Sequence, residues 1–320
     1  LVVNLYCGAV STVLLMMNQD KLSGLMIWGA GSLVQTGWED AQYLAPRLAI
    51  AIVIAFLFVK PLSLLQLSEQ GAKSLGVSLP KLRIVCLGLA VMLTAWVVSA
   101  VGVIGFVGLA APALARLMGV NRLVPKLLVS MLLGGLLLSL TDLAIQQLPG
   151  LMAMIIPTGA ATAALGAPLL LWLLPKLSMK SQAQTQTVLT RRSEVASRLN
   201  KNAVALAGIV ILSALVLFSL FSLQTDGWSW LFVSKEWALL EWRLPRLVAA
   251  ALAGGMLAVA GTIVQRLSGN PMASPEVIGI SSGTALGLII AIFTGLGTSV
   301  VGLYIGGFVG AIGTLGIIVL

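Results

Sequence analysis

The sequence predicts an all-α, polytopic transmembrane bundle, and three features support this fold class. Hydrophobic residues make up 59% of the 320 positions, charged residues only 9%, and the mean hydropathy is +1.06. A soluble domain carries roughly 25% charged residues, so this chain has too little charge to cover a water-facing surface. Charge-free windows close to the roughly 20 residues that a spanning helix needs recur along the chain. Lipid is therefore expected to be its main solvent.

The charge-free windows predict about ten spanning helices. They are expected at residues 1–18, 43–63, 84–104, 106–118, 126–147, 154–175, 202–223, 245–267, 280–295 and 299–320. Segment 24–36 lies between acidic residues and is too short to span, so we expect a half-helix at the outer surface.

Residues 84–115 fit either one long tilted helix or two short helices with a break among the glycines at 102–108. The positive-inside rule separates these alternatives. With two crossings, Arg83, the basic residues of 116–126 and the polar stretch 176–201 share one side of the membrane. That side then carries a net charge of +11 and the outer side −2. We therefore predict two crossings.

Residues 177–200 form the one long polar stretch of the sequence. Gln, Ser, Thr and basic residues dominate it, and this composition cannot bury a core, so we expect a cytoplasmic linker. Its paired arginines are typical of the flanks of membrane spans, so no nucleic-acid partner is predicted. The chain begins without a methionine and ends inside an apolar run, from which we expect a slice of a longer polypeptide.

The sequence holds no recognisable catalytic or metal-binding constellation, and no cofactor is predicted. It has no histidine, and Cys7 and Cys86 lie in apolar runs as expected of small core or lipid-facing residues. It lacks a Gly-Lys-Ser/Thr phosphate loop, so we do not expect it to bind ATP by that device. Asp142 is the one acid well inside an apolar context. It is either a functional intramembrane acid or a hydrogen-bond partner of a neighbouring helix end.

Three groups of motifs stand out. The first is EWRLPR at 241–246, followed by a small-residue helix and NPMASPEVIGISSG at 270–283. The second is AKSLGV at 72–77 followed by PKLR at 80–83. The third is GFVGLAAP at 105–112, with PTG at 157–159 and LGAP at 165–168.

Together these motifs strongly resemble the FecCD/vitamin B12-type permease family of ABC importers over nearly the whole chain. The second and third groups resemble the carboxy-terminal half of a family member, and the first resembles the amino-terminal half although it comes later. We therefore expect residues 1–176 to be the carboxy-terminal part of one permease unit. Residues 201–320 would be the amino-terminal part of a second, joined by the linker 177–200. Such a fused double permease is characteristic of importers of iron(III)-hydroxamate siderophores of the ferrichrome type.

The resemblance implies a multi-pass inner-membrane transport subunit that is not itself an enzyme. It would move iron-siderophore from periplasm to cytoplasm, with a periplasmic siderophore-binding protein and two cytoplasmic ATPase subunits as partners, and with membrane lipid around it. A permease for another chelate, such as a cobalamin or a catecholate siderophore, remains an alternative, as does an ion-driven secondary transporter.

The first motif group predicts a docking surface at the outer mouth. Arg243 and Arg246, three residues apart, share a helix face beside Glu241, and two guanidiniums there are suited to carboxylates on a docking protein. The resemblance implies that this partner is the binding protein; headgroup anchoring is the alternative. Gln146 stands where the family carries an arginine after the Asp142 segment.

The second motif group predicts a cytoplasmic knob at residues 67–80. A short helix, a glycine turn and a second short element fit its pattern. The resemblance implies that it contacts the ATPase, whereas an ordinary loop is the alternative. The expected coupling residues are Ser68, Glu69, Ala72, Leu75 and Gly76.

The prolines of the 270–283 motif break the helix that precedes it, and broken segments near membrane depth often line transport pathways. A plain cytoplasmic turn is the equally weighted alternative. The candidate pathway or gating residues are Asn270, Pro271, Pro275, Gly279 and Asp142.

Overall fold

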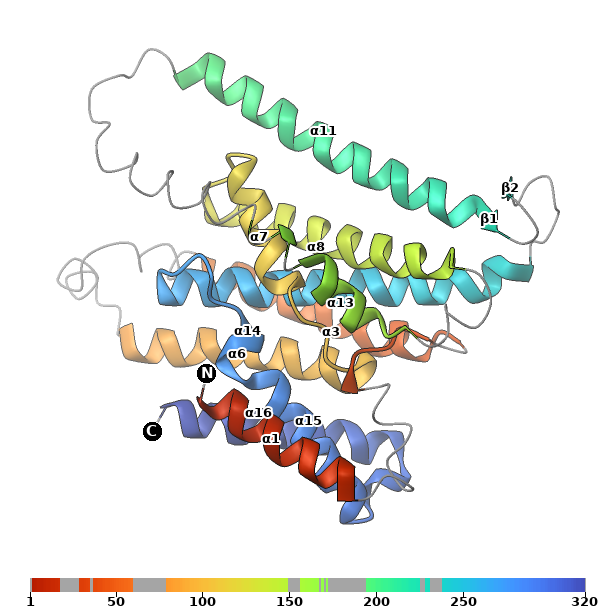
Figure 1. The fold of residues 1–320 in the computed structure, drawn as a ribbon. Coiled ribbons are helices and arrows are strands. Elements are labelled where there is room, and N and C mark those ends of the chain that lie inside the picture. The colour runs from red at the N-terminus through yellow and green to blue at the C-terminus, as the bar shows by residue number, and fades with distance from the viewer. Residues whose placement is uncertain are drawn as a thin grey trace.

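Helices running side by side make up most of the molecule (Figure 1). This computed structural model describes residues 2–17, 29–34, 37–59, 79–148, 156–166, 168–169, 171, 194–224, 228–230 and 238–319. Within these ranges the only strands form one hairpin of two three-residue strands. The predicted all-α class is confirmed, with this hairpin as an unpredicted addition.

The elements follow one another as successive passes of the chain. They are α1 (Val2–Met17), α3 (Glu39–Leu57), α6 (Leu79–Val101), α7 (Val107–Leu117), α8 (Leu123–Gln146), a helical stretch at 158–166, α11 (Glu194–Phe221), β1 (Ser222–Gln224), β2 (Trp228–Trp230), α13 (Ala238–Ser268), α14 (Pro275–Ile278), α15 (Ile280–Phe293), the 3-10 turn η1 (Leu296–Thr298) and α16 (Val300–Val319).

Five of these helices are long and apolar enough to cross a membrane. They are Glu39–Leu57, Pro80–Val101, Leu123–Gln146, Leu239–Ser268 and Val301–Ile318. Four further apolar helices of the described residues are shorter, at Val2–Met17, Val107–Leu117, Leu206–Phe221 and Ile280–Phe293. The chain is thus a multi-pass helical membrane protein, but the predicted number of about ten spans is not confirmed.

The break predicted within 84–115 is present. Helix α6 ends at Val101, and α7 begins at Val107 after an irregular stretch in which Gly102 has a φ of 77°. A left-handed glycine ends a helix without steric cost, because it has no Cβ to collide with the following carbonyl. With 11 residues, α7 is only about 16 Å long, which is too short to cross a bilayer. The second element is therefore a partial pass.

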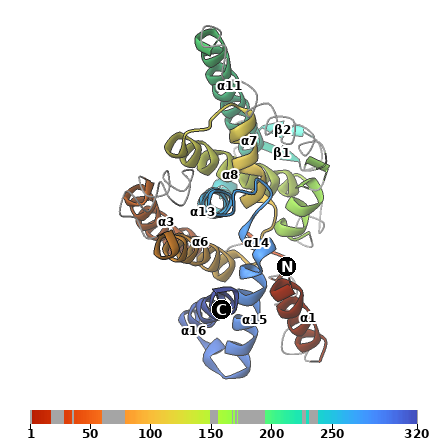
Figure 2. The ribbon, with the colours of Figure 1, turned by 90° about the vertical axis from the view of Figure 1, so that its left-hand side faces the viewer.

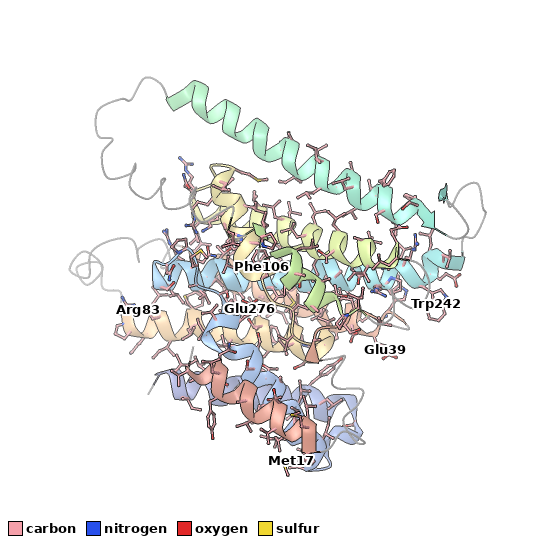
Figure 3. The ribbon with its side chains drawn as sticks, in the orientation of Figure 1. Met17, Glu39, Arg83, Phe106, Trp242 and Glu276 are labelled. Atoms are coloured by element: carbon pink, nitrogen blue, oxygen red, sulfur yellow. The ribbon has the colours of Figure 1, made fainter. Side chains whose placement is uncertain are left out.

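Two oppositely charged residues, Arg83 and Glu39, lie at opposite ends of the bundle (Figure 3). Arg83 lies at one end, here called the Arg83 end, and Glu39 and Trp242 lie at the opposite one, the Trp242 end. Arg116 belongs to the Arg83 end, because its Nη2 donates to Oε1 of Gln265 near the last turn of α13, 2.9 Å away. The chain therefore returns between Arg83 and Arg116, as the two-crossing topology requires.

Helix α13 occupies the centre of the bundle, and α3, α6, α7 and α8 pack around it (Figure 2). Small residues allow this close packing. A Cβ on Gly254 would overlap the carbonyl of Gly134 on α8, and one on Gly261 would overlap that of Gly108 on α7. Lipid tails are as apolar as leucine, so close backbone contact rather than water exclusion favours helix association in the bilayer. Residues from both sides of the predicted linker therefore share one core.

A second layer is formed by α15 and α16, which pack on each other and on α6 (Figure 2). Their seam is also made of glycines, with Gly287 of α15 against Gly306 and Gly310 of α16. Helix α1 completes this layer by packing on α15.

Two predicted helix starts are wrong. Helix α11 begins at Glu194, so the last residues of the expected linker are helical. Helix α13 begins at Ala238 and carries Pro245 in its interior, where we expected a helix start. Residues 31–34, in the second half of the expected half-helix 24–36, are irregular and partly buried against 101–104, whereas residue 29 is helical and residues 24–28 lie outside the described residues. Gly31, at φ 77°, allows this approach because it leaves room for the carbonyl of Val103.

Candidate functional site

Asp142 is the best-satisfied charge at the Trp242 end. Its side chain is fully buried on α8 and accepts two hydrogen bonds from Arg246 of α13, each 2.6 Å long. Gln146 Nε2 donates to the same carboxylate at 2.8 Å, and the Thr158 hydroxyl donates at 3.1 Å. A bidentate guanidinium with further donors is the arrangement in which a buried ion pair offsets its desolvation cost. This geometry agrees with the alternative in which Asp142 ties neighbouring helices together.

The two arginines predicted to dock a partner are turned toward the bundle. Arg246 is 13% exposed because Asp142 holds its guanidinium. Arg243 donates through Nη1 to the carbonyls of Leu220 and Ser222, both at 2.9 Å, which ties α13 to α11 and β1. Glu241, in contrast, is exposed, as is the neighbouring Trp242. The surface open to a partner is therefore centred on the acid and the indole, and docking itself stays a prediction.

A second polar cluster at this end joins α3, α6 and α16. The Arg47 guanidinium lies 3.5 Å from the ring centroid of Tyr43 and 5.9 Å from that of Trp96. Tyr43 stacks on Tyr304 with 3.9 Å between centroids. Cation–π contacts of this kind are worth up to about 2 kcal/mol when they are desolvated. The Arg47 contacts join α3 to α6, and the Tyr43–Tyr304 stack joins α3 to α16, which the sequence assigns to the second unit.

The break between α6 and α7 brings together motifs that lie far apart in sequence (Figure 3). Phe106 caps α7 with a φ of 75°, a conformation that costs free energy for a residue with a side chain. Its ring packs on Gly166, where any Cβ would overlap it. The N–H of Ser32 donates to Val101 O at 2.9 Å, at the end of α6. Parts of the predicted half-helix, the GFVGLAAP motif and the LGAP motif therefore meet at one place.

Glu276 of α14 lies beside this break. A Cβ on Gly108 in the first turn of α7 would be 3.2 Å from Glu276 Oε1 and 3.1 Å from Leu257 O of α13. The carboxylate therefore fills the space that the missing side chain of Gly108 leaves between α7 and α13. Neither of its oxygens has a hydrogen-bond partner among the described residues, and both are fully buried.

Burial raises the pKa of the Glu276 carboxyl, because removal from water disfavours the charged form. The nearby Ser274 hydroxyl and the backbone N–H of Glu276 act in the opposite direction, but neither reaches hydrogen-bond geometry with the carboxylate. Buried carboxyls of this kind are concentrated at functional sites. The sequence reasoning missed Glu276, although an acid directly after Pro275, at the edge of a long charge-free run, was a usable signal.

The candidate pathway residues fall into two groups. Asn270 and Pro271 form a turn, in which Asn270 is exposed and its Oδ1 accepts from the N–H of Met272 at 2.9 Å. Pro275 and Gly279 are buried at the two ends of α14. Gly279 has a φ of 104° and lies against the backbone of Asn4 in α1. The first group fits the plain turn, the second is buried between helices, and a role of either group in a pathway stays a prediction.

The predicted coupling residues Ser68, Glu69, Ala72, Leu75 and Gly76 lie outside the described residues. In the described part of the chain, no group of three or more His, Cys, Asp or Glu side chains gathers to hold a metal ion. Cys7 and Cys86 are both buried as free thiols.

A model of the FecCD transport family matches residues 1–176 and 204–320. The chain belongs to the FecCD transport family. It is 43% identical over its whole length to the iron(3+)-hydroxamate import system permease protein FhuB of Escherichia coli, covering 48% of that protein. It is 42% identical over its whole length to the protein of the same name from Salmonella typhimurium, covering 46% of it. The chain thus spans about half the length of these relatives.

Other FecCD relatives match only part of the chain. The Fe(3+) dicitrate transport system permease protein FecC of Escherichia coli is 35% identical over 170 residues, which is 52% of this chain and 50% of that protein. No solved structure matches the chain. The whole-chain matches therefore set the hydroxamate permeases apart from the relative named for citrate.

Proposed function

We propose that this chain is part of the permease of an ABC importer that carries iron(III)-hydroxamate siderophores across the bacterial inner membrane. The observation that carries the proposal is similarity over the whole chain, on both sides of the linker, to permeases named for iron(3+)-hydroxamate import. Relatives named for Fe(3+) dicitrate and ferric enterobactin match about half of it. The alternative chelates are therefore less well supported.

We further propose that the Trp242 end faces the periplasm and the Arg83 end faces the cytoplasm. The segregation of Arg83 and Arg116 to one end supports this orientation, because basic residues are retained on the cytoplasmic side. In this topology the shorter apolar helices add partial or tilted passes, up to about ten spans. A variant without native cysteines, carrying Thr190→Cys or Trp242→Cys, tests it. Trp242→Cys should react with an impermeant maleimide in intact spheroplasts, and Thr190→Cys only after lysis.

At the Trp242 end, the loaded binding protein would dock on a surface centred on Glu241 and Trp242. The two arginines would support this surface by fixing the elements around it. Arg243 bonds the backbone of α11 and β1 beside the hairpin, and Arg246 bonds Asp142 of α8. An exposed carboxylate beside an exposed indole offers a charged rim and an apolar anchor, as interfaces commonly do.

Energy would come from two cytoplasmic ATPase subunits that contact the 67–80 segment. The charge-poor helices support an external energy source, because the described spans hold no chain of acids suited to an ion relay. An ion-driven carrier would lose uptake on addition of an uncoupler while cellular ATP is held constant. An ATP-driven one would keep it.

The pathway would pass the central break, with Glu276 on its wall. Three helices of different length end or bend there, so small rotations of α7 and α14 would open or close a space beside the carboxyl. In its protonated form this carboxyl would donate as well as accept hydrogen bonds, which suits the oxygen-rich surface of a chelated iron complex.

Uptake measurements test the proposal directly. Cells that lack their own hydroxamate permease but keep the binding protein and ATPase receive the intact gene, and accumulation of radioactive iron is followed. Ferrichrome iron should enter at least tenfold faster than in cells with an empty vector, whereas ferric citrate and ferric enterobactin should not. Equal rescue of all three chelates, or of none, would contradict the assigned substrate class.

A further inference from the structure

The turn that starts α7 is strained. Gly105 O accepts a hydrogen bond from the N–H of Val107, 2.9 Å away, so Phe106 is the central residue of a three-residue γ-turn. Its φ of 75° and ψ of −35° belong to the form of this turn with positive φ, which is rare and strained. Among the residues that the structure describes, Phe106 is the only non-glycine residue at positive φ. Such a conformation persists only where the surrounding structure holds it.

The Phe106 ring holds this turn by packing on Gly166. A Cβ on Gly166 would overlap three carbon atoms of the ring, and its three nearest atoms all belong to Phe106. The ring therefore lies directly over a residue that has no side chain to displace it. Phe106 is only partly buried, so the ring also has an open side toward which it can move away from Gly166.

Gly166 belongs to an element that is fixed at its other end. It is the last residue of the helical stretch 158–166, and the Thr158 hydroxyl at the start of this stretch donates to Asp142 of α8 at 3.1 Å. Eight residues separate Thr158 from Gly166, which is about 12 Å along a helix. Asp142 in turn accepts from Arg246 of α13. The ring therefore packs on an element tied to the two helices α8 and α13.

The strained turn sets the direction of α7, and α7 encloses Glu276. The Phe106 carbonyl accepts hydrogen bonds from the N–H groups of Leu109 and Ala110, at 3.0 and 2.8 Å, so the first turn of α7 is built on this residue. Gly108, in the same turn, leaves the space that the Glu276 carboxylate fills. Figure 3 places Phe106 and Glu276 between the Arg83 end and the Trp242 end. A backbone rotation at Phe106 would therefore move Gly108 relative to the carboxylate.

We propose that Phe106 is a positioning residue for transport, and that its contact with Gly166 holds α7 in a closed arrangement. In this arrangement the ring packs on Gly166 and the Glu276 carboxylate is enclosed. When the ring leaves Gly166, the backbone of Phe106 relaxes to negative φ, α7 turns, and Gly108 moves away from the carboxylate. Backbone strain favours this opening and the ring contact opposes it. The inference rests on the pathway proposed above and names the residue that opens it.

Two substitutions at Phe106 separate the ring from the backbone strain. Phe106→Ala removes the ring but keeps a Cβ that disfavours positive φ, whereas Phe106→Gly removes the ring and adopts positive φ without steric cost. In the purified intact permease, backbone amide exchange in residues 107–112 should be several-fold faster in Phe106→Ala and nearly unchanged in Phe106→Gly. Ferrichrome iron uptake should fall about tenfold only in Phe106→Ala, because transport needs the closed arrangement as well as the open one. A role in packing alone predicts the reverse order, since glycine removes more of the side chain.

A substitution at Gly166 tests the same contact from its other side. Gly166→Ala places a methyl group where the ring lies, so amide exchange and uptake should change as they do in Phe106→Ala. Addition of Phe106→Gly to this variant should restore both, because no ring remains to be displaced. Gly88→Ala on α6 is the matched control. Nothing lies within 4 Å of its new Cβ, and it should change neither measurement.

Amide exchange is measured without substrate, so it tests the contact separately from the proposed function. If the unmodified protein took up no ferrichrome iron, the proposed function would fail, and the exchange rates would still decide whether the contact holds α7. Equal exchange in Phe106→Ala and Phe106→Gly, or a double variant no better than Gly166→Ala, would overturn the inference. So would normal uptake in Phe106→Ala and Gly166→Ala despite faster exchange, because the contact would then hold α7 without any part in transport.

Discussion

Two buried carboxylates, Asp142 and Glu276, have opposite surroundings. Asp142 accepts four hydrogen bonds from three side chains on three segments and is neutralised by Arg246. Glu276 has no hydrogen-bond partner among the described residues and faces the first turn of α7. A fully satisfied buried charge joins helices, whereas an unsatisfied one is costly and persists where it has another use.

The position of each acid in the fold agrees with this difference in hydrogen bonding. Asp142 lies near the end of α8 and contacts Arg246 of α13 and Thr158 at the start of the 158–166 stretch, so its hydrogen bonds hold these three elements together. Glu276 lies on α14 beside the break between α6 and α7. At this break Phe106 has a positive φ, and the chain has fewer regular hydrogen bonds. The first site is expected to govern stability, and the second is expected to govern transport.

Removal of the Asp142 carboxylate should have the largest effect. Asp142→Ala leaves the Arg246 guanidinium buried without its counter-charge, which typically costs about 3–5 kcal/mol of unfolding free energy. Thermal unfolding in detergent, followed by the exposure of buried thiols Cys7 and Cys86, measures the loss. The double variant Asp142→Leu with Arg246→Met should recover most of the stability, because both charges are gone. A single variant as stable as the unmodified protein would show that the pair contributes nothing.

The close approach of α7 and α13 under Glu276 should come next. Gly261→Ala places a methyl group on the Gly108 carbonyl, so the helices must separate, at a cost of about 1–3 kcal/mol. Gly313→Ala on α16 is the matched control, because nothing lies within 4 Å of its new Cβ. It should stabilise by about 0.5–1 kcal/mol through reduced backbone freedom in the unfolded chain. The same thermal unfolding assay compares the stabilities of the two variants. A Gly261→Ala variant more stable than Gly313→Ala would contradict the close contact between α7 and α13.

The break between α6 and α7 was predictable from sequence, because glycines in a charge-free run and the placement of Arg83 and Arg116 both required it. The positions of most described helices were also predictable, since apolar length is the strongest signal that a membrane helix leaves, but the count of about ten spans is not confirmed. The length of α7 was not, because the charge-free run continues through the irregular residues 102–106, and its glycines indicate a break without fixing the residue at which the next helix begins.

The pairing of Asp142 with Arg246 could not be read from sequence. The two residues are 104 positions apart, and either one alone fits several roles. Gln146, noted only as a departure from the family pattern, gains a role as a donor to the same carboxylate. Glu276 belongs to the 270–283 motif, whose prolines fit a pathway segment or a plain turn equally well, and nothing in the motif singles out this acid. Only packing against Gly108, on a distant segment, shows that its carboxylate is buried.

A neutral isostere at Glu276 should separate folding from transport. Glu276→Gln keeps the volume and removes the possibility of a buried charge, so the fold should be at least as stable as before. Ferrichrome iron uptake should nevertheless fall about tenfold, because the amide offers one acceptor oxygen where the carboxyl offers two. The exposed Glu39→Gln is the control and should transport normally. Full uptake by Glu276→Gln would leave the buried carboxyl without a part in transport.

The smallest effect expected is a change in how stability depends on pH. Glu276 lies between α13 and α15, outside the spanning helices, and burial raises its pKa above the ordinary value in the unfolded chain. The folded state therefore binds more protons than the unfolded state, so this group lowers stability as the pH rises from about 4.3 through its folded pKa. The melting temperature of the unmodified protein, minus that of Glu276→Gln, should decrease from pH 4 to pH 8. A difference that is constant with pH would mean that the carboxyl titrates alike in both states, and it would remove the argument that Glu276 is held apart from water.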